Sequence, residues 1–329
     1  MSHFFYSIYD ILVIRFYSKG RYFNMKKDTD EYLLTVLEKG DTFYHYTSAE
    51  GLQGILSGEF WVTESHFLND ITEFHVATDI FLEVINRNIK NKTIKEKLKK
   101  AVCEGVKLLV DDDITFDEQL GFDDDYVISF CLDKDSILMW SEYSNFCGYS
   151  IEFDFDALIH SFSKTDNIIH GKVVYNHEEQ ISLMEQTIEK EIFEFPHLYK
   201  YPNSWDEFNK ITDDQIRKIA SQLEMLVYYY NMFFKKECFS GENEYRFVFM
   251  CAHNDKTTED YRKEEQYFRV KDNVLIPFVK KKLSSLDSVN SILIGPKNNS
   301  DIAEKGVKHF LRYHKIKAKV EKSEMPLRY

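Results

Sequence analysis

The stretch SGENEYRFVF, residues 240–249, places two carboxylates, Glu242 and Glu244, directly before an apolar and aromatic run. The run predicts a strand, and side chains two residues apart on a strand share one face. If that face lines a cleft, the pair can stabilise positive charge that develops on a sugar. If it faces water, the two glutamates are ordinary edge charges, which an isolated Glu-x-Glu often is. The choice depends on what else in the chain can share a site with them.

Length and composition predict a globular protein with a substantial core. The chain has 329 residues, of which 43% are hydrophobic, including 27 Phe and 21 Tyr. Its formal charge of −13 argues against general attraction to nucleic acid or to anionic membranes, which requires a basic surface. The five cysteines are scattered and form no C-x-x-C pair, so neither a disulfide framework nor a zinc site is expected. A cytoplasmic location follows as an expectation.

The N-terminal residues are apolar enough to suggest a membrane-spanning helix, but charged residues among them argue against one. Residues 3–17 are apolar, but Asp10 and Arg15 interrupt them, so no spanning helix is expected. Met25 precedes a polar segment and offers an alternative start. We therefore interpret residues 1–40 as an N-terminal extension with little bearing on function.

The remaining pattern predicts a mixed α+β protein. Strands are expected near residues 41–48, 59–63, 126–132, 148–155, 245–250, 266–270, 274–278, 291–294 and 317–321. Helices are expected at 49–56, twice between 72 and 110, at 136–143 and at 301–313. Residues 178–236 are charged and helical in pattern, which indicates an insertion. The acidic clusters at 111–113 and 123–125 lack the spacing of a calcium loop and are interpreted as linker.

Familiar catalytic motifs are missing from the sequence. It contains no G-x-x-x-x-G-K-[ST], no G-x-G-x-x-G after a strand, no H-E-x-x-H and no G-x-S-x-G. Phosphate-loop, dinucleotide-fold and zincin chemistry are therefore not expected, and neither is a metal. A nuclease or phosphodiesterase is disfavoured, because the Asp clusters lack metal-site spacing.

Several polar and aromatic residues at strand ends are the remaining candidates. His45 and Thr47 share one face of the predicted strand at 41–48, while Tyr46 lies on the other. Ser129 lies in an apolar strand that leads into a helix carrying Trp140 and Tyr143. Taken singly, His45 fits a hydrogen-bonded core histidine, Ser129 a filler, and the two aromatic residues core packing.

Their order along the chain resembles that of the ADP-ribosyltransferase superfamily. In that superfamily an early His or Arg, a middle Ser or Tyr and a late Glu meet in a cleft between two small sheets. The resemblance implies an ADP-ribosyltransferase-like split β-sheet core, formed by a single domain over residues 41–329 with the helical insertion at about 178–236. It also implies NAD as substrate and no metal.

The chain also resembles domain-of-unknown-function family 2971 (DUF2971) between about residues 43 and 328. The stretches that carry this resemblance are YHYTS at 44–48, LND at 68–70 with Glu73, MWSEY at 139–143, ENEYR at 242–246, IPF at 276–278, Gly295-Pro296, and Ser323 with Pro326 and Arg328. Such proteins often carry His where this chain has Glu142, so no role is assigned there.

The superfamily resemblance implies roles for the two glutamates and for their nearest neighbour. Glu244 would contact the ribose hydroxyl next to the reacting carbon, where its charge favours a cationic transition state. Glu242 would position or deprotonate the acceptor. Arg246 would pair with Glu244 and hold the pKa of its carboxyl low, or contact a phosphate; a simple cross-strand ion pair is equally compatible.

The same resemblance implies a nucleotide-binding set around the cleft. His45 would hydrogen-bond the adenosine ribose, with Thr47 beside it, and Ser129 would support the strand edge near nicotinamide. Three aromatic residues would offer stacking surfaces, namely Tyr46, Trp140 and Tyr143. Asn69 and Asp70 would shape the rim, although helix capping explains them equally well.

The expected function is therefore NAD-dependent ADP-ribosyl transfer to an unknown protein or nucleic-acid acceptor, in a bacterial toxin or antiviral (phage) defence setting. No membrane partner is expected, and a regulatory partner protein is compatible with this interpretation. The alternative is a non-catalytic module of the same fold that senses a nucleotide or binds a protein.

Overall fold

The computed structural model describes residues 33–68, 73–110, 125–162, 167–193, 202–250, 265–271, 273–298 and 300–326. Most of the predicted N-terminal extension, the rim residues Asn69 and Asp70, and the acidic clusters apart from Asp125 lie outside these ranges. Among the described residues, no helix combines the length and the apolar composition needed to cross a membrane.

The described residues group into two compact units. Those within 72–115 and 176–234 form a helical unit, and those within 34–71, 116–175 and 235–329 form a sheet unit. The sequence interpretation treated residues 41–329 as one domain with an insertion. In the structure the two helices between residues 72 and 115 belong to the same unit as the insertion helices.

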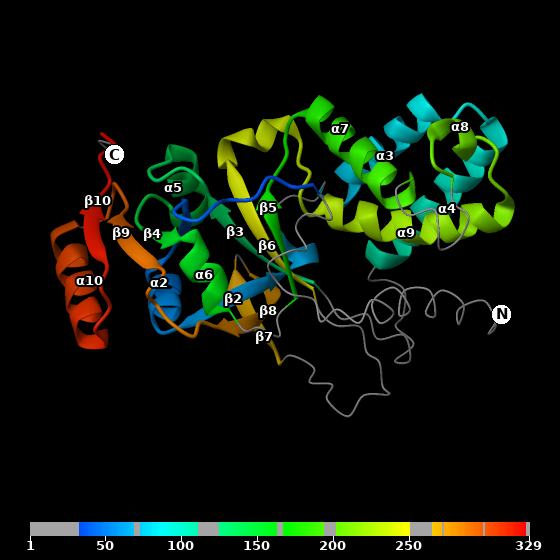
Figure 1. Ribbon diagram of the computed structural model, residues 1–329. Coiled ribbons are helices and arrows are strands. Elements are labelled where there is room, and N and C mark those ends of the chain that lie inside the picture. Colours follow the sequence, from blue (N-terminus) through cyan, green and yellow to red (C-terminus); the bar gives the residue numbers. More distant parts are fainter. Residues whose placement is uncertain are drawn as a thin grey trace. The chain divides into compact units, whose positions relative to one another are not determined.

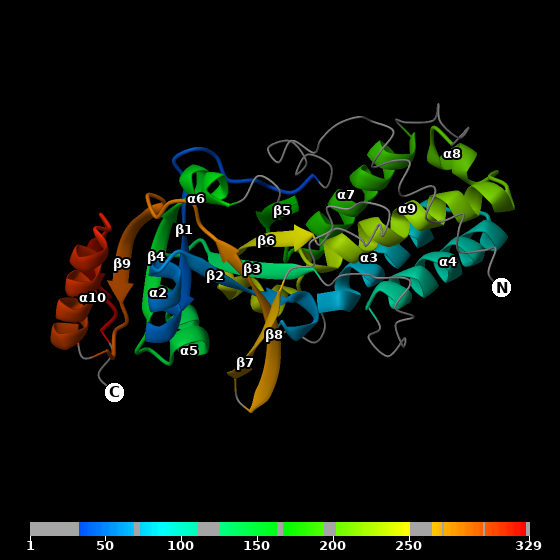
Figure 2. The ribbon, with the colours of Figure 1, turned by 90° about the horizontal axis from the view of Figure 1, so that it is seen from below.

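In the helical unit, long helices pack side by side (Figures 1 and 2). α9 contacts both α3 and α4, and α3 also contacts α7. Buried apolar residues recur along α9 from Ile216 to Val227 at helical spacing, which explains its packing. The helices of this unit are α3 (Glu73–Asn88), α4 (Lys92–Val110), α7 (His177–Ile188), α8 (Trp205–Phe208) and α9 (Asp213–Asn231), with a π-helical segment η3 (Glu189–Phe193).

The sheet unit contains a ten-stranded mixed sheet within its described residues. The order is β10-β9-β4-β1-β3-β2-β8-β7, with β6 paired to β3 and β5 paired to β6. The strands are β1 (Thr42–Thr47), β2 (Glu59–Glu64), β3 (Tyr126–Cys131), β4 (Tyr149–Asp154), β5 (Asn167–Lys172), β6 (Glu244–Met250), β7 (Gln266–Lys271), β8 (Val274–Lys282), β9 (Val289–Ile294) and β10 (Lys319–Lys322). This confirms a mixed α+β class, although β5 was not predicted.

Strand β3 marks a division in this sheet. Along one edge it pairs with β6 over its whole length, from Tyr126 to Cys131. Along the other edge it pairs with β2 at Tyr126 and Val127 and with β1 only at Cys131. Residues 128–130 of β3 therefore have no strand partner on that edge, and β1 and β2 diverge there.

Alternation along the strands produces two different faces. One face is a large aromatic core in which Phe43, Phe130, Phe153 and Phe247 contact one another. Helices of the unit cover it with buried apolar residues, namely α2 (Ala49–Leu56), α6 (Phe155–Ser161) and α10 (Ser300–His314). Figure 1 shows α10 alongside β9 and β10.

The opposite face carries a smaller apolar cluster around α5 (Ile137–Ser144). Trp140 of this helix is fully buried and packs edge-on against Tyr46 of β1, with ring centroids 4.8 Å apart. Asn145 ends α5 in the left-handed region at φ 47°, which Asn tolerates well. The helix therefore packs against the same face of the sheet that carries Glu244.

Candidate functional site

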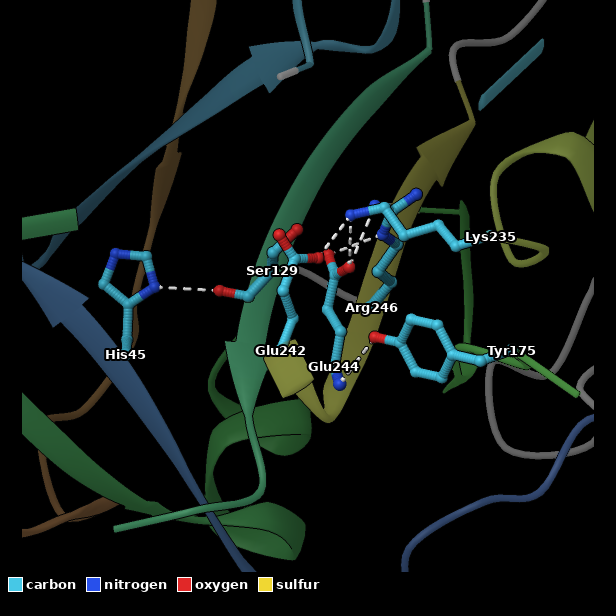
Figure 3. A network of polar contacts seen from close by, with 7 residues as sticks. All are labelled: His45, Ser129, Tyr175, Lys235, Glu242, Glu244 and Arg246. Carbon is cyan, nitrogen blue, oxygen red and sulfur yellow. Dashed lines mark hydrogen bonds and ion pairs between the residues drawn. The ribbon is translucent and has the colours of Figure 1, made fainter. Parts of the chain in front are cut away.

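Four charged side chains contact one another at the start of β6. They are Lys235, Glu242, Glu244 and Arg246, hereafter the charge cluster (Figure 3). Glu244 lies opposite Cys131 in the β3–β6 ladder, and Arg246 lies opposite Ser129. Directly opposed residues project on the same face of a sheet. The register therefore brings Ser129, Glu244 and Arg246 together.

Arg246 and Glu244 form a bidentate ion pair on β6. Arg246 Nε lies 2.6 Å from Glu244 Oε1, and Arg246 Nη2 lies 3.0 Å from Glu244 Oε2. Both residues are buried, with exposed fractions of 1% for Arg246 and 5% for Glu244. The predicted pairing of Arg246 with Glu244 is present, in the geometry that makes Arg–carboxylate contacts strong.

Lys235 supplies the second positive charge. Its Nζ lies 2.6 Å from Glu242 Oε2 and 3.1 Å from Glu244 Oε2. Its backbone N–H donates to the carbonyl oxygen of Val174 at 3.1 Å, which holds the residue beside the sheet. Two carboxylates thus face two cations, so burial of the charge cluster does not leave an unpaired charge.

Glu242 reaches the charge cluster from a helix and not from the strand. It is the last residue of the 3-10 helix η4 (Glu237–Glu242), and Asn243 follows in the left-handed region at φ 42°. The structure therefore differs from the strand arrangement considered for Glu242 and Glu244. The two carboxylates meet through the shared Lys235 ammonium and not through β-alternation.

The pKa values of the two glutamates are shifted in opposite directions. Burial would raise the pKa of the Glu244 carboxyl, but the charges of Arg246 and Lys235, together with hydrogen bonds from Arg246 and Ser129, outweigh it and lower the pKa. For Glu242, burial raises the pKa of the carboxyl despite the Lys235 charge. Glu244 is therefore a fixed anion, while Glu242 is the more basic of the two carboxylates.

Glu244 accepts three hydrogen bonds from the two cations. A carboxylate offers about four lone-pair positions. Arg246 donates to it twice and Lys235 once, which leaves about one position for a further donor. Glu242 has one described donor, Lys235, and its Oε1 has no partner within the described residues. Tyr175 supports the same segment, because its phenolic oxygen accepts a hydrogen bond from the Glu244 backbone N–H at 3.1 Å.

His45 is bound to the edge of β3 where the sheet divides. Its Nδ1 lies 3.0 Å from the carbonyl oxygen of Ser129. A carbonyl only accepts, so Nδ1 carries the proton and Nε2 presents a lone pair in the neutral ring. Burial lowers the pKa of His45 to about 4, and this effect outweighs the hydrogen bond to Ser129. At neutral pH, His45 is therefore an acceptor at Nε2.

His45 and Glu244 project on opposite faces of the sheet. Tyr44, Cys131 and Glu244 share a face through their ladder pairs, and His45 follows Tyr44 on β1, so it projects the other way. Consistent with this, the His45 ring packs against Phe60 and Phe130 of the aromatic core. Ser129 contacts both sides, because its carbonyl oxygen accepts from His45 and its side chain shares the face of Glu244 (Figure 3).

A cavity of about 60 Å³ lies beside this divided edge. Its lining includes His45 and Thr47 of β1, the residues expected to contact adenosine ribose, and Arg269 of β7. Arg269 extends to Thr63, whose hydroxyl oxygen accepts from Arg269 Nη2 at 2.7 Å. The cavity is therefore bordered by one neutral acceptor and one cation, together with the carboxylates of Glu50 and Glu59.

The predicted stacking residues are packed elsewhere. Trp140 Nε1 donates to Asp135 at 2.6 Å, and the Tyr46 hydroxyl donates to the Asp133 carbonyl at 2.8 Å. Tyr143 packs against the same small apolar cluster. None of the three borders the cavity beside His45. They support β1 and β3 from the face that carries the charge cluster.

Three residues of this region were absent from the sequence interpretation: Lys235, Tyr175 and Arg269. Lys235 falls at the end of the predicted insertion, and no local pattern distinguishes it from other lysines. Arg269 alternates with exposed apolar residues of a hairpin strand. The only sequence signal for Lys235 and Tyr175 was the apolar pair before each, FF at 233–234 and VV at 173–174, and such pairs are common in this chain.

Comparison with known proteins gives one match. Residues 139–247 match the family described as "Protein of unknown function (DUF2971)". The matched segment includes the whole charge cluster but neither His45 nor Ser129. No curated protein and no solved structure matches the chain.

Proposed function

We propose that this protein is an NAD-dependent ADP-ribosyltransferase with an unidentified protein or nucleic-acid acceptor. The observation that carries the proposal is that the buried Glu244 carboxylate and the partly buried Glu242 carboxylate share the Lys235 ammonium, while their pKa values are shifted in opposite directions. Such a pair can serve one step that stabilises positive charge and another that removes a proton.

The proposed step requires both carboxylates. When the bond between nicotinamide and ribose breaks, its electron pair leaves with neutral nicotinamide and positive charge develops on the ribosyl carbon. The negative charge of Glu244, set in a site with little water, favours that charged state. The acceptor nucleophile then bonds to the same carbon and releases its proton to Glu242, the more basic carboxylate.

Substrate contact with Glu244 would use the carboxylate position that Arg246 and Lys235 leave open. A ribose hydroxyl that donates there, on the face that Ser129 shares, would keep both ion pairs intact. This gives Ser129 a defined place in the proposal, next to the reacting sugar. The division of the sheet at Ser129 also supports an ADP-ribosyltransferase-like split β-sheet as the fold.

A second function is favoured by the same ion pairs of Glu244. A buried carboxylate that two cations already neutralise is stable without substrate, as it would be in a module that binds a nucleotide without turnover. The alternative is therefore a nucleotide-sensing or protein-interaction module with the same fold. It predicts nucleotide binding without nicotinamide release.

Measurement of nicotinamide release from NAD, with candidate proteins and nucleic acids as acceptors, tests the proposal. Wild-type protein should release nicotinamide and label an acceptor, whereas Glu244→Gln and Glu242→Gln should both lose activity. Glu237→Gln is the matched control, because Glu237 is exposed on the same 3-10 helix as Glu242. Activity that survives Glu244→Gln undiminished, or nucleotide binding with no release under any acceptor, would reject the transferase.

A further inference from the structure

Three strands of the sheet have a strand partner on one side only within the described residues, namely β5, β7 and β10. Such edge strands can pair with another chain, and proteins usually protect them with charges or cover. β5 is covered, because the Lys172 backbone N–H donates to the Thr35 carbonyl oxygen at 2.9 Å. β10 is short and has exposed lysines at both ends, Lys319 and Lys322. These two edges are therefore protected against further pairing.

β7 exposes apolar side chains instead. It is the outer strand of a hairpin with β8, and Figure 2 shows this hairpin extending beyond the other strands of the sheet. Phe268 and Val270 share one face of β7 and are 60% and 72% exposed. Leu275 lies opposite Val270 on β8 and is 63% exposed. An apolar edge strand of this kind is suited to pairing with another chain.

The sequence of this edge, EQYFRVK at 265–271, is complementary to itself when it is read in the opposite direction. In an antiparallel pair centred on Phe268, Glu265 lies opposite Lys271 of a second copy, and the same contact forms again on the other side of the centre. Glu265 and Lys271 are both exposed. The Tyr267 hydroxyl donates to the Glu265 carboxylate at 2.6 Å and so holds it on the face that Lys271 shares. Opposite charges that face each other directly across a ladder stabilise it.

Other twofold registers fit less well. A centre at Arg269 places this arginine opposite its own copy, which sets like charges together. A centre at Tyr267 places Glu265 opposite Arg269, whose guanidinium already donates at 2.7 Å to a hydroxyl of its own chain. That centre also leaves Lys271 without an opposite charge. Of the three registers, the one centred on Phe268 pairs the exposed charges and opposes no like ones.

We propose that β7 pairs with β7 of a second copy of this chain, about a twofold axis at Phe268, so that the protein is a symmetric dimer with a continuous sheet. The two Phe268 side chains meet at the axis and lose their exposure to water, which favours association. A twofold contact of this kind uses the exposed edge of both copies and closes the assembly. The dimer is independent of the transferase proposal, because no residue of the charge cluster lies on β7.

Sedimentation velocity of the full chain over a dilution series tests the dimer. Wild-type protein should sediment as a dimer at the higher concentrations. Lys271→Glu sets two pairs of like charges across the ladder and should raise the dissociation constant of the dimer about tenfold or more, as should Glu265→Lys. The double variant Glu265→Lys/Lys271→Glu restores opposite charges and should return the constant to within about threefold of wild type. Lys319→Glu is the matched control, since it makes the same charge change at an exposed position of β10.

Phe268→Asp tests the centre of the contact, because it places two carboxylates at the axis and should also favour the monomer. Circular dichroism should show native spectra for all variants, since the substituted side chains are exposed. The inference fails if wild-type protein is monomeric throughout the series, if Lys271→Glu and Phe268→Asp leave the dimer unchanged, or if the double variant stays as weak as the single ones. Growth into open-ended oligomers would also reject it, because a twofold contact closes at the dimer.

Discussion

Arg246 and Glu244 lie two residues apart on β6 and form a bidentate ion pair in which both side chains are buried. The pair is local in sequence, but its burial is not. It depends on β3 on one side, through Ser129, and on Lys235 on the other.

Removal of Arg246 alone should destabilise the sheet unit strongly. Arg246→Met leaves a buried carboxylate with one cation fewer, a change that costs about 3–5 kcal/mol in other proteins. Denaturant unfolding of Arg246→Met and of the double variant Arg246→Met/Glu244→Met measures it. The double variant should recover much of the loss, because no charge of the pair is left unpaired. Arg312→Met, exposed on α10, is the control, and equal losses in the single and double variants would contradict the prediction.

Lys235→Met should make stability depend on pH at Glu242. The Lys235 ammonium lowers the pKa of the Glu242 carboxyl, and burial already raises it, so loss of Lys235 raises it further. A carboxyl with a raised pKa in the folded state ionises first in the unfolded state, so stability falls as pH increases between the two pKa values. The thermal midpoint of the variant should therefore drop more at pH 8 than at pH 5.

A second substitution isolates the cause of that pH dependence. Glu242→Gln in the Lys235→Met background removes the carboxyl and should restore a flatter profile. Lys236→Met changes the neighbouring, exposed lysine and should leave the profile of the wild type. If Lys235→Met shows the same loss at both pH values, the two carboxylates do not share the ammonium as described.

Two buried histidines should weaken the fold in mild acid. Burial lowers the pKa of both His45 and His170 to about 4, from an ordinary value near 6.5. Because the unfolded histidines protonate first, the stability that they contribute is complete above about pH 6.5 and is lost as pH falls toward 4. Thermal unfolding across this window should show a smaller decline for His170→Gln than for wild type. His309→Gln, on α10, serves as the comparison, and an unchanged decline in His170→Gln would count against the prediction.

Gly148 should not tolerate a side chain, whereas Gly306 should. A Cβ at Gly148 would lie 2.3 Å from the Thr47 carbonyl oxygen and 2.5 Å from Ser144 Cβ, so Gly148→Ala forces apart the segments that hold β1 and α5. We expect a loss of about 1–3 kcal/mol, as for other overpacked sites. Gly306 lies in α10 with nothing within 4 Å of an added Cβ. Gly306→Ala should raise stability by up to about 1 kcal/mol through helix propensity, and denaturant unfolding should show opposite signs for the two.

Local patterns predicted most of the secondary structure. Strands expected at 59–63 and 126–132 correspond to β2 and β3, and the helix expected at 49–56 has the bounds of α2. The missed strand, β5, contains His170 and Gly171 within a short segment and gains its place by pairing with β6. Its polar and glycine residues weaken the local strand pattern, and the strand therefore depends on its pairing with β6.

The candidate site was only partly predictable. The proximity of Arg246 to Glu244 follows from strand alternation and is present. Glu242 was expected on the same strand as Glu244. In the structure it ends a 3-10 helix, because Asn243 turns the chain immediately before β6. Lys235 and Arg269 carried no local signal, since their importance comes from neighbours that are distant in sequence.

The amino-acid sequence alone determined the α+β class, the aromatic core and the position of the strand that carries Glu244, because periodicity and residue type act between near neighbours. Only the tertiary structure decided that Lys235 joins the two carboxylates, that the sheet divides at Ser129, and that His45 and Glu244 leave it on opposite faces. Those features depend on register and on counter-ions contributed by remote segments. A one-residue change in register would reverse the faces while leaving every local pattern unchanged.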